Sequence, residues 1–185
     1  VEKKVSAKSI VIGSANEPLI KELIDINQWQ SIENEGFVIQ SIIRDNKPIV
    51  VIAANTDNGL LYGVFELIRQ LQSGVSLAGL NLVEQPSYDV RVLNHWDNLD
   101  GSVERGYAGH SLWKWDELPG VISPRYVQYA RANASIGING VVLNNVNATP
   151  EVLSNGHLKK VKVLADIFRP YGIKTYQAVN FSSPK

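Results

Sequence analysis

The first half of the chain combines short apolar runs with stretches of helical spacing. Three apolar runs bounded by turn residues predict strands, over residues 9–13, 36–44 and 49–54. The last two strands flank a turn at residues 45–48, so we expect them to form a hairpin. Asn16 is predicted to cap a helix that has Pro18 in its first turn. The apolar positions of this helix follow at helical spacing: Leu19, Ile20, Leu23 and Ile24.

A second helix is predicted to run through Gln72. Three consecutive residues are able to cap it, namely Thr56, Asp57 and Asn58. Its apolar residues form a wide face that must pack against a sheet, and they are Leu60, Leu61, Val64, Phe65, Leu67, Ile68 and Leu71. The order β-α-β-β-α therefore predicts a small α+β domain over residues 1–88, in which residues 73–88 are the linker to a second domain.

The second half, residues 89–185, changes to a regular alternation of strand and helix. Strands are predicted around residues 90–93, 138–144 and 173–179. Between them, Ser123-Pro124 and Thr149-Pro150 each join a capping residue to a proline suited to the first helical turn. Two apolar stripes follow these starts: Tyr126, Val127, Ala130 and Ala134, then Leu158, Val161, Leu164, Ala165 and Phe168. The order β-α-β-α-β predicts parallel strands with right-handed crossovers, which would begin either a doubly wound sheet or a (β/α)8 barrel.

Polar side chains follow each of these three strands. The groups are Asn94, His95 and Trp96, then Asn144, Asn145 and Asn147, and finally Gln177, Asn180 and Ser182. Because the carboxyl ends of parallel strands meet at one edge of a sheet, we expect a shared binding site there. Amides both donate and accept hydrogen bonds, and an indole covers the C–H face of a pyranose, so the pattern favours a hydroxyl-rich ligand such as a sugar. Each asparagine taken alone also fits a turn.

The segment after the first of these strands is long and rich in aromatic and hydrogen-bonding groups. Residues 95–115 contain two of the three histidines and three of the four tryptophans. Such a loop is typical of a binding site at the mouth of a sheet or barrel, and the alternative is a surface loop of incidental polarity. Asp97 and Glu104 suggest an acid–base pair, but turn formation and an ion pair with Arg105 explain them at least as well. We expect no metal, because His95, Asp97 and His110 lack a recognisable ligand spacing.

Composition narrows the class of protein. The 185 residues are 44% hydrophobic and 19% charged, which is typical of a folded globular chain. The formal net charge of zero gives no reason to expect nucleic acid or an anionic membrane as a partner. The absence of cysteine excludes disulfides and thiol nucleophiles and fits a cytosolic or a periplasmic protein equally. Residues 89–185 carry 11 Lys or Arg against 8 Asp or Glu, a mild basic excess that favours an anionic ligand.

Residues 94–109 strongly resemble the start of the catalytic barrel in the α-glucuronidases of glycoside hydrolase family 67. The flanking sequence agrees in register: residues 136–147 resemble the second barrel strand of the family, and residues 169–173 resemble the entry to the third. Residues 56–67 resemble the N-terminal domain of the family, a module that also precedes the barrels of hexosaminidase-type glycosidases. The resemblance covers essentially the whole chain.

The resemblance implies an N-terminal domain at 1–88, followed at 89–185 by the first three strands of a (β/α)8 barrel. It also implies hydrolysis, with inversion, of the α-1,2 bond between glucuronic acid or its 4-O-methyl ether and the xylose of xylo-oligosaccharides. Family enzymes supply the catalytic acid and base from strands beyond the third, so we expect no catalytic residue in this chain and no activity from it alone. The implied partners are glucuronoxylan-derived aldouronic acids, without any cofactor. The parent enzyme is compatible with a homodimer.

The resemblance also implies binding residues. Trp96 matches the tryptophan that packs on the uronic acid, and Val146 matches the small apolar residue near the 4-O-methyl group. Further candidates beside them are His95, Asp97, Asn98, Asn144 and Asn145, with Arg105 as a helper for the uronate that fits a surface role equally well. The alternative reading is a non-catalytic carbohydrate-binding or accessory module that uses a cleft at Trp96.

Overall fold

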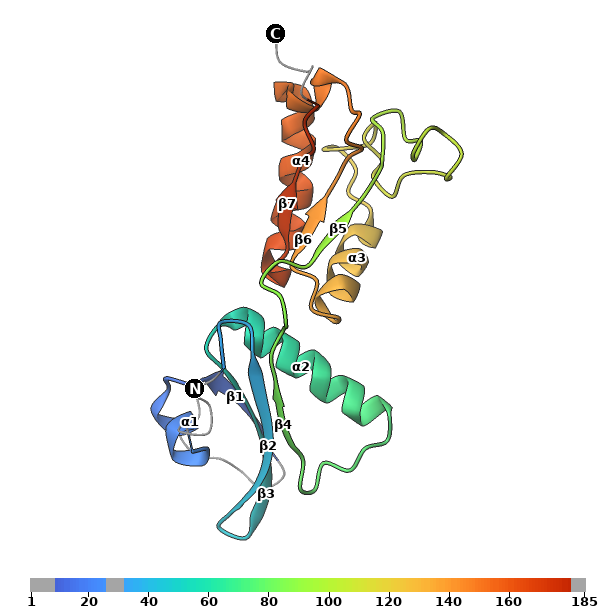
Figure 1. Cartoon of the computed structure of the whole chain (residues 1–185). Coiled ribbons are helices and arrows are strands. Elements are labelled where there is room, and N and C mark those ends of the chain that lie inside the picture. Colours follow the sequence, from blue (N-terminus) through green and yellow to red (C-terminus); the bar gives the residue numbers. More distant parts are fainter. Residues whose placement is uncertain (1–8, 26–31, 181–185) are drawn as a thin grey trace. The chain divides into compact units, whose positions relative to one another are not determined.

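The computed structural model describes residues 9–25 and 32–180 (Figure 1). Packing divides the chain into two compact units, residues 1–89 and residues 90–185. The first unit contains a four-stranded sheet and two helices, in the order β1 (Ser9–Ser14), α1 (Pro18–Leu23), β2 (Phe37–Arg44), β3 (Lys47–Ala54), α2 (Asp57–Gln72) and β4 (Asn81–Glu84). The strands lie in the order β1-β3-β2-β4. Strand β1 is parallel to β3, and β2 is antiparallel to both β3 and β4.

Strand β3 separates two apolar cores. Its alternate residues Ile49, Val51 and Ala53 pack in a core that includes Ile20 and Leu23 of α1. The intervening residues belong to the second core, which includes Tyr62 and Leu67 of α2. The continuous apolar run of β3 is therefore explained by helices on both faces of the sheet, as expected for a strand buried on two sides.

Three predictions in this unit were wrong in detail. The predicted linker contains β4, whose residue Asn81 pairs with Gln40 of β2. The predicted four-residue turn is a two-residue turn: Asp45 and Asn46 have φ of 50° and 59°, and Lys47 already pairs with Arg44. Helix α1 is capped by Glu17, without a side-chain hydrogen bond, rather than by Asn16. By contrast, Thr56 caps α2 as predicted, its hydroxyl accepting from the Gly59 backbone N–H.

The second unit contains a three-stranded parallel sheet. Its main elements are β5 (Val92–Asn94), α3 (Pro124–Ala134), β6 (Gly140–Val142), α4 (Asn155–Phe168) and β7 (Lys174–Tyr176), and the strands lie in the order β5-β6-β7. The two short 3-10 helices are η2 (Pro150–Leu153) and η3 (Arg169–Tyr171). The prediction of parallel strands alternating with helices is confirmed. The strands are shorter than predicted, because only three residues of each join the ladder.

The helices cover one face of this sheet. Val141 of β6 packs with Tyr126 and Ala130 of α3 and with Leu164 and Phe168 of α4. Successive strand residues point to opposite faces, and paired residues share a face. The rows Val92–Gly140–Lys174 and Asn94–Val142–Tyr176 therefore lie on the face away from the helices.

Helix boundaries in this unit follow local hydrogen bonds more than apolar spacing. Ser123 caps α3 as predicted, with Pro124 as its first residue. Thr149-Pro150 starts only the short η2, and α4 begins after Ser154, whose hydroxyl accepts from the His157 backbone N–H. The prediction that Thr149 starts the long helix was therefore wrong. Two stripe residues, Val127 and Leu158, are exposed rather than buried.

Candidate functional site

The loop after β5 is held in shape by its own backbone. The Asn98 N–H donates to the Ser102 carbonyl at 2.8 Å, and the Glu104 N–H donates to the Trp96 carbonyl at 2.9 Å. Glu104 adopts φ of 60°, a left-handed conformation that is uncommon outside glycine. Its carbonyl accepts the side-chain amides of Asn98, at 2.8 Å, and Asn145, at 3.3 Å. The Glu104 carbonyl is thus a central acceptor that helps to hold the loop in one conformation.

Four polar side chains next to this loop contact one another in series, and we call this series the polar chain. The Ser111 hydroxyl donates to Asp97 Oδ2, and Asp97 Oδ1 lies 3.5 Å from His95 Nδ1. On its other side, His95 Nε2 lies 2.7 Å from the Tyr129 hydroxyl of α3. Asp97 is 3% exposed, so the centre of the polar chain is shielded from solvent. Burial, assisted by the Asp97 charge, raises the pKa of Tyr129, which therefore stays protonated.

Aromatic rings surround His95 on the helix side. Its ring centroid lies 5.1 Å from that of Trp113 and 5.5 Å from that of Tyr129. Trp113 in turn contacts Tyr129 edge to face at 5.2 Å and Phe168 of α4 at 5.8 Å. These contacts, with the polar chain, fix His95 against the core.

Trp96 lies between two residues that are anchored in this way. It is 37% exposed, whereas its neighbour Asp97 is buried and its neighbour His95 is half-buried. In an extended chain, adjacent side chains point to opposite sides. His95 is anchored on the side that carries α3, through the Tyr129 hydroxyl, so the neighbouring Trp96 indole is directed to the other side, away from the helices.

The two asparagines after β6 use their side chains within the unit. The Asn144 side chain donates to the Ala178 carbonyl at 2.9 Å and accepts from the Ala178 N–H at 3.0 Å, like a backbone pair extending the sheet. Asn145 donates its backbone N–H to the Asp97 carbonyl at 2.8 Å and accepts from the Asn147 N–H at 3.0 Å. Both side chains are almost fully buried. The hydrogen bonds of these two predicted binding residues join neighbouring strand ends.

The remaining predicted residues are more accessible. Val146 is 41% exposed and follows Asn145 directly. Arg105 is exposed and forms no ion pair with any residue in the described ranges. Gln177 donates to the Val152 carbonyl at 3.2 Å, and Ser182 lies outside the described residues. The second predicted group is therefore bonded on both sides, through Asn145 to Asp97 beside the first group and through Asn144 to Ala178 beside Gln177 of the third.

The other carboxylates of the loop have local partners. Asp100 Oδ1 accepts from the Ser102 hydroxyl at 2.7 Å and from the Ser102 N–H at 2.9 Å. The hydroxyl contact is the main cause that lowers the pKa of Asp100, which is therefore ionised at neutral pH. Glu104 Oε2 accepts from the Tyr107 hydroxyl at 3.4 Å. Asp100 therefore forms a turn with Ser102, whereas the turn predicted at Asp97 is replaced by its bond to the Ser111 hydroxyl, and the predicted ion pair of Glu104 with Arg105 is not found among the described residues.

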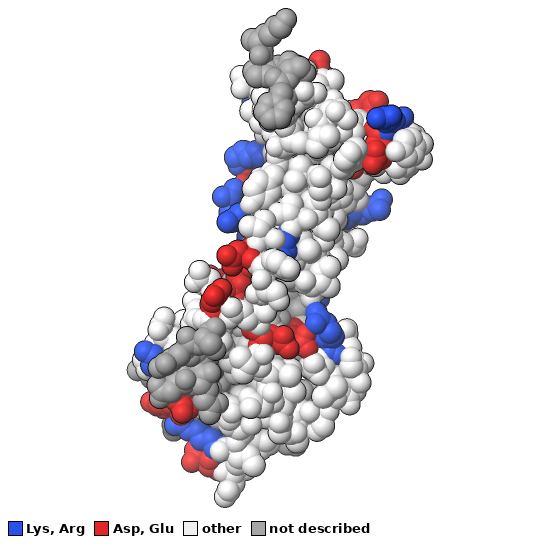
Figure 2. Space-filling view, in the orientation of Figure 1, with Lys and Arg blue, Asp and Glu red and all other residues white. Residues whose placement is uncertain are grey.

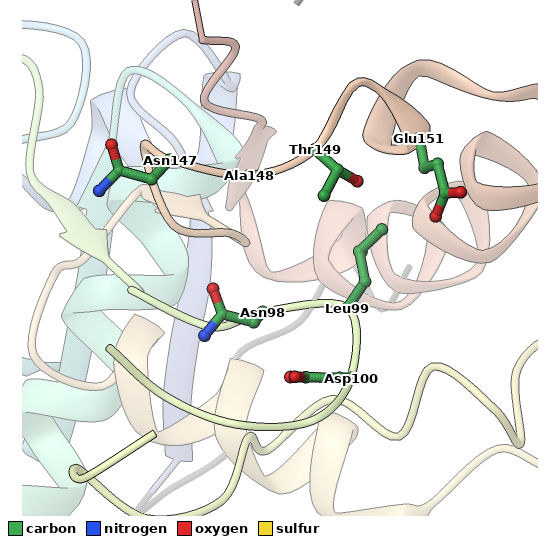
Figure 3. Close-up of a pocket in the computed structure, with 7 residues that line it drawn as sticks. All are labelled: Asn98, Leu99, Asp100, Asn147, Ala148, Thr149 and Glu151. Atoms are coloured by element: carbon green, nitrogen blue, oxygen red, sulfur yellow. The ribbon is translucent and has the colours of Figure 1, made fainter. Parts of the chain in front are cut away.

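A pocket of about 500 Å³ lies between the loop after β5 and the segment after β6 (Figure 3). Its lining residues are Asn98, Leu99, Asp100, Asn147, Ala148, Thr149 and Glu151. Figure 3 shows the side chains of Leu99, Thr149 and Glu151 converging, with Asn98 and Asn147 at the other end. Figure 2 shows both signs of charge on the projecting loop after β5, and Lys and Arg along the edge of this unit that carries α4.

Sequence reasoning missed several residues of this site. Tyr129 lies three positions after Tyr126, so helical spacing was a signal that it faces the same core as Tyr126. Nothing in the local pattern indicated that Ser111 meets Asp97.

Within the described ranges, no group of three or more His, Cys, Asp or Glu side chains is arranged to hold a metal ion. No helix between residues 9 and 25 or between 32 and 180 is long and apolar enough to span a membrane.

Comparison with known protein families assigns this chain to the glycosyl hydrolases. Residues 70–185 match the middle domain of glycosyl hydrolase family 67, and residues 1–67 match the N-terminus of the same family. The chain belongs to glycosyl hydrolase family 67, which confirms the resemblance seen in residues 94–109. The two family segments meet within α2, whereas packing divides the chain after residue 89.

Curated relatives that match this chain are named as alpha-glucuronidases. The chain is 36% identical to the probable alpha-glucuronidase A of Aspergillus clavatus, over 98% of this chain and 21% of that protein. It is 41% identical to the alpha-glucuronidase A of Emericella nidulans, over 75% of this chain and 17% of that protein. The chain thus spans about a fifth of the length of these relatives.

A solved structure shares the fold. A GH138 enzyme targeting pectin rhamnogalacturonan II matches 92% of this chain and 20% of its own length, with a TM-score of 0.58 and 17% sequence identity. At that identity the match concerns the fold alone.

Proposed function

We propose that this chain is the N-terminal part of an α-glucuronidase. The enzyme would hydrolyse the α-1,2 bond between glucuronic acid, or its 4-O-methyl ether, and the xylose of xylo-oligosaccharides, with inversion. Support comes from membership of family 67 and from the names of the curated relatives. The observation that carries the proposal is the exposed Trp96 indole, held between the anchored His95 and Asp97.

Trp96 is suited to the apolar face of a sugar. An exposed indole directed away from the helices offers a flat apolar surface on which pyranose C–H groups pack. Val146 offers a second apolar contact, for the 4-O-methyl group. The backbone hydrogen bond between Asn145 and Asp97 links the residues next to these two side chains, so both belong to one edge of the sheet.

His95 and Asp97 serve this site indirectly in our proposal. Their polar atoms meet Tyr129 and Ser111, so they hold Trp96 in place rather than bind the sugar. Asn144 and Asn145 likewise support the strand ends. Direct contacts would come from the side-chain oxygen of Asn98, from Trp96 and from Val146, with Arg105 as a helper for the uronate.

Catalysis would require carboxyl groups from elsewhere in the enzyme. An inverting glycosidase needs a carboxylic acid and a carboxylate roughly 6.5–9.5 Å apart, so that a water molecule fits between base and sugar. Asp97, Asp100 and Glu104 are each engaged by a neighbouring hydroxyl. We therefore propose that the acid and base lie in a longer protein that includes this chain, called here the complete enzyme, and that the 185 residues alone are inactive.

The parallel sheet fits the first part of a (β/α)8 barrel. Its three strands are parallel and in sequence order, and the helices cover one face. Further parallel strands beside β7 and β5 would close the barrel and place Trp96 and Val146 at its carboxyl-terminal mouth, where barrel enzymes bind substrates. This closure is part of the proposal.

One observation favours a second candidate, a carbohydrate-binding module. The loop after β5 is shaped by contacts within its own unit, so a sugar could bind without further strands. The two candidates differ in chemistry alone: a module would bind the sugar without cleaving it.

The test is product release from a 4-O-methylglucuronic acid-bearing xylo-oligosaccharide, followed by proton NMR. The complete enzyme should release the uronic acid with its anomeric configuration inverted, while the 185-residue chain should release none. Release with retention would contradict the mechanism. Release by the 185 residues alone would refute the claim that they lack the catalytic groups, and binding without release by the complete enzyme would favour the module.

A further inference from the structure

We propose that the pocket between the loop after β5 and the segment after β6 binds a neutral, hydroxyl-rich sugar unit of the substrate, and not the uronate. This inference rests on the proposed function and assigns a distinct part of the ligand to a distinct part of the surface. The volume of the pocket, about 500 Å³, lies within the usual range of small-ligand sites.

The charge of the lining excludes an anion. Asp100 and Glu151 place two carboxylates on the pocket, and the described residues that line it include no Lys or Arg. Hydrogen bonds from Ser102 lower the pKa of Asp100 and keep it ionised. A uronate carboxylate in this pocket would meet like charges, which disfavours its binding there.

The hydrogen-bonding groups that remain free are mainly acceptors. The Asn98 side-chain nitrogen donates to Ser102 Oγ, at 3.0 Å, and to the Glu104 carbonyl. The side-chain oxygen of Asn98 is therefore the group left to face the pocket. Both carboxylates also accept, and the Thr149 hydroxyl either donates or accepts. Sugar hydroxyls are donors that match such a lining.

Apolar atoms complete the match to a sugar. Leu99 and Ala148 line the same pocket, and Figure 3 shows the Leu99 side chain directed between Thr149 and Glu151. A pyranose or xylosyl ring has polar edges and C–H faces. A pocket with acceptor groups around a small apolar patch matches both, whereas a bare cation would leave the apolar patch without a partner.

The pocket walls are already in place. The Asn147 N–H donates to Asn145 Oδ1, and the Ala148 N–H donates to the Asn145 carbonyl, both at 3.0 Å. On the facing loop, Asp100 is held by Ser102. Little ordering is therefore needed on binding, which favours affinity.

The two parts of the site are contiguous in sequence on both segments. Trp96 lies two residues before Asn98, and Val146 lies directly before Asn147. A substrate with its uronic acid on Trp96 and Val146 would thus extend its neutral part toward the pocket. This continuity is what assigns the pocket to the xylose side of the bond.

The test is calorimetric titration of the complete enzyme with two separate probes, xylobiose and 4-O-methylglucuronic acid. Glu151→Ala and Thr149→Val should each weaken xylobiose binding about tenfold, the loss of roughly 1.4 kcal/mol of hydrogen bonding, and leave binding of the uronic acid unchanged. Trp96→Ala should show the opposite pattern. Asp116→Asn removes an exposed carboxylate outside the pocket and should change neither titration.

The outcomes separate the two proposals. Unchanged xylobiose binding in both pocket variants, with uronic acid binding still dependent on Trp96, would overturn the pocket assignment and leave the proposed function standing. Failure of the unaltered enzyme to bind either probe would count against the proposed function itself. Calcium binding that is lost in Glu151→Ala, without any xylobiose binding, would show a cation site and overturn the sugar assignment.

Discussion

The backbone N–H of Asn145 donates a 2.8 Å hydrogen bond to the carbonyl of Asp97, and this bond joins the ends of two neighbouring parallel strands. It connects the residue before Val146 to the residue after Trp96. The Asn145 side chain adds a second link to the same loop, through the Glu104 carbonyl. The positions of Trp96 and Val146 therefore depend on buried polar groups of the residues beside them.

Replacing the Asn145 side chain should loosen the loop. Asn145→Ala removes the bonds to the Glu104 carbonyl and from the Asn147 N–H and leaves their partners poorly satisfied. We expect a loss of about 1–3 kcal/mol in the free energy of unfolding, measured with urea. Asn147→Ala, at an exposed neighbouring position, is the matched control and should change stability much less. Equal losses in the two variants would contradict the anchoring role.

Removing the Tyr129 hydroxyl should weaken the position of Trp96. Tyr129→Phe keeps the ring contacts with Trp113 but leaves His95 Nε2 without its 2.7 Å partner. We expect about 1 kcal/mol of destabilisation together with weaker binding of 4-O-methylglucuronic acid by the complete enzyme. Tyr176→Phe serves as the control, since Tyr176 of β7 is 41% exposed. Unaltered uronic acid binding in Tyr129→Phe would show that the polar chain does not position the indole.

An added methyl group on β6 should strain the sheet. A Cβ at Gly140 would lie 2.7 Å from Val92 Cγ2 and 3.0 Å from Tyr176 Cε2, closer than side chains normally pack. Gly140→Ala should therefore cost about 1–3 kcal/mol and lower the melting temperature. Gly156→Ala offers a control in α4, where a Cβ meets nothing within 4 Å, and should be neutral or stabilising. A stable Gly140→Ala variant would contradict the close packing described for β5, β6 and β7.

His157 should make stability depend on pH. Burial, assisted by the charge of Lys160, lowers the pKa of His157 below its ordinary value of 6.5, and its Nε2 has no hydrogen-bond partner among the described residues. The unfolded chain therefore binds this proton at a higher pH than the folded chain. The free energy of unfolding should rise with pH up to about 6.5 and level off above it, as far as this group is concerned.

The measurement is urea unfolding of the protein and of His157→Gln at about pH 5 and about pH 7.5. The variant should lose part of the acid destabilisation that the unaltered protein shows. Identical differences between the two pH values in both proteins would mean that His157 titrates alike in the folded and unfolded chains.

Apolar periodicity predicted the elements whose burial is complete. The run of β3 and the stripe Tyr126, Ala130 and Ala134 lie in cores, as their patterns indicated. Strand β4 was missed because it lies at the sheet edge and Val83 is 53% exposed, so it carries no alternating pattern. The start of α4 was misplaced because two capping residues, Thr149 and Ser154, lie five positions apart, and spacing alone does not rank them.

For the candidate site, the sequence predicted that polar side chains follow the strands, but not which groups they bond. The amides after β6 were expected at the strand ends, and they lie there. Whether an amide meets solvent or a backbone carbonyl depends on contacts distant in sequence, such as Asn144 with Ala178. The same limit applies to His95 and Asp97, whose partners Tyr129 and Ser111 come from other segments.

The most direct test of the account compares Trp96→Ala and Trp96→Phe in the complete enzyme, by kcat/KM for release of 4-O-methylglucuronic acid from an aldouronic acid. An indole that stacks on the sugar predicts a loss of about 10–100-fold in the alanine variant and a much smaller loss in the phenylalanine variant, which keeps a flat apolar face. Unchanged kcat/KM in Trp96→Ala, in an enzyme of normal stability, would contradict the central claim that this exposed side chain forms the sugar-binding surface.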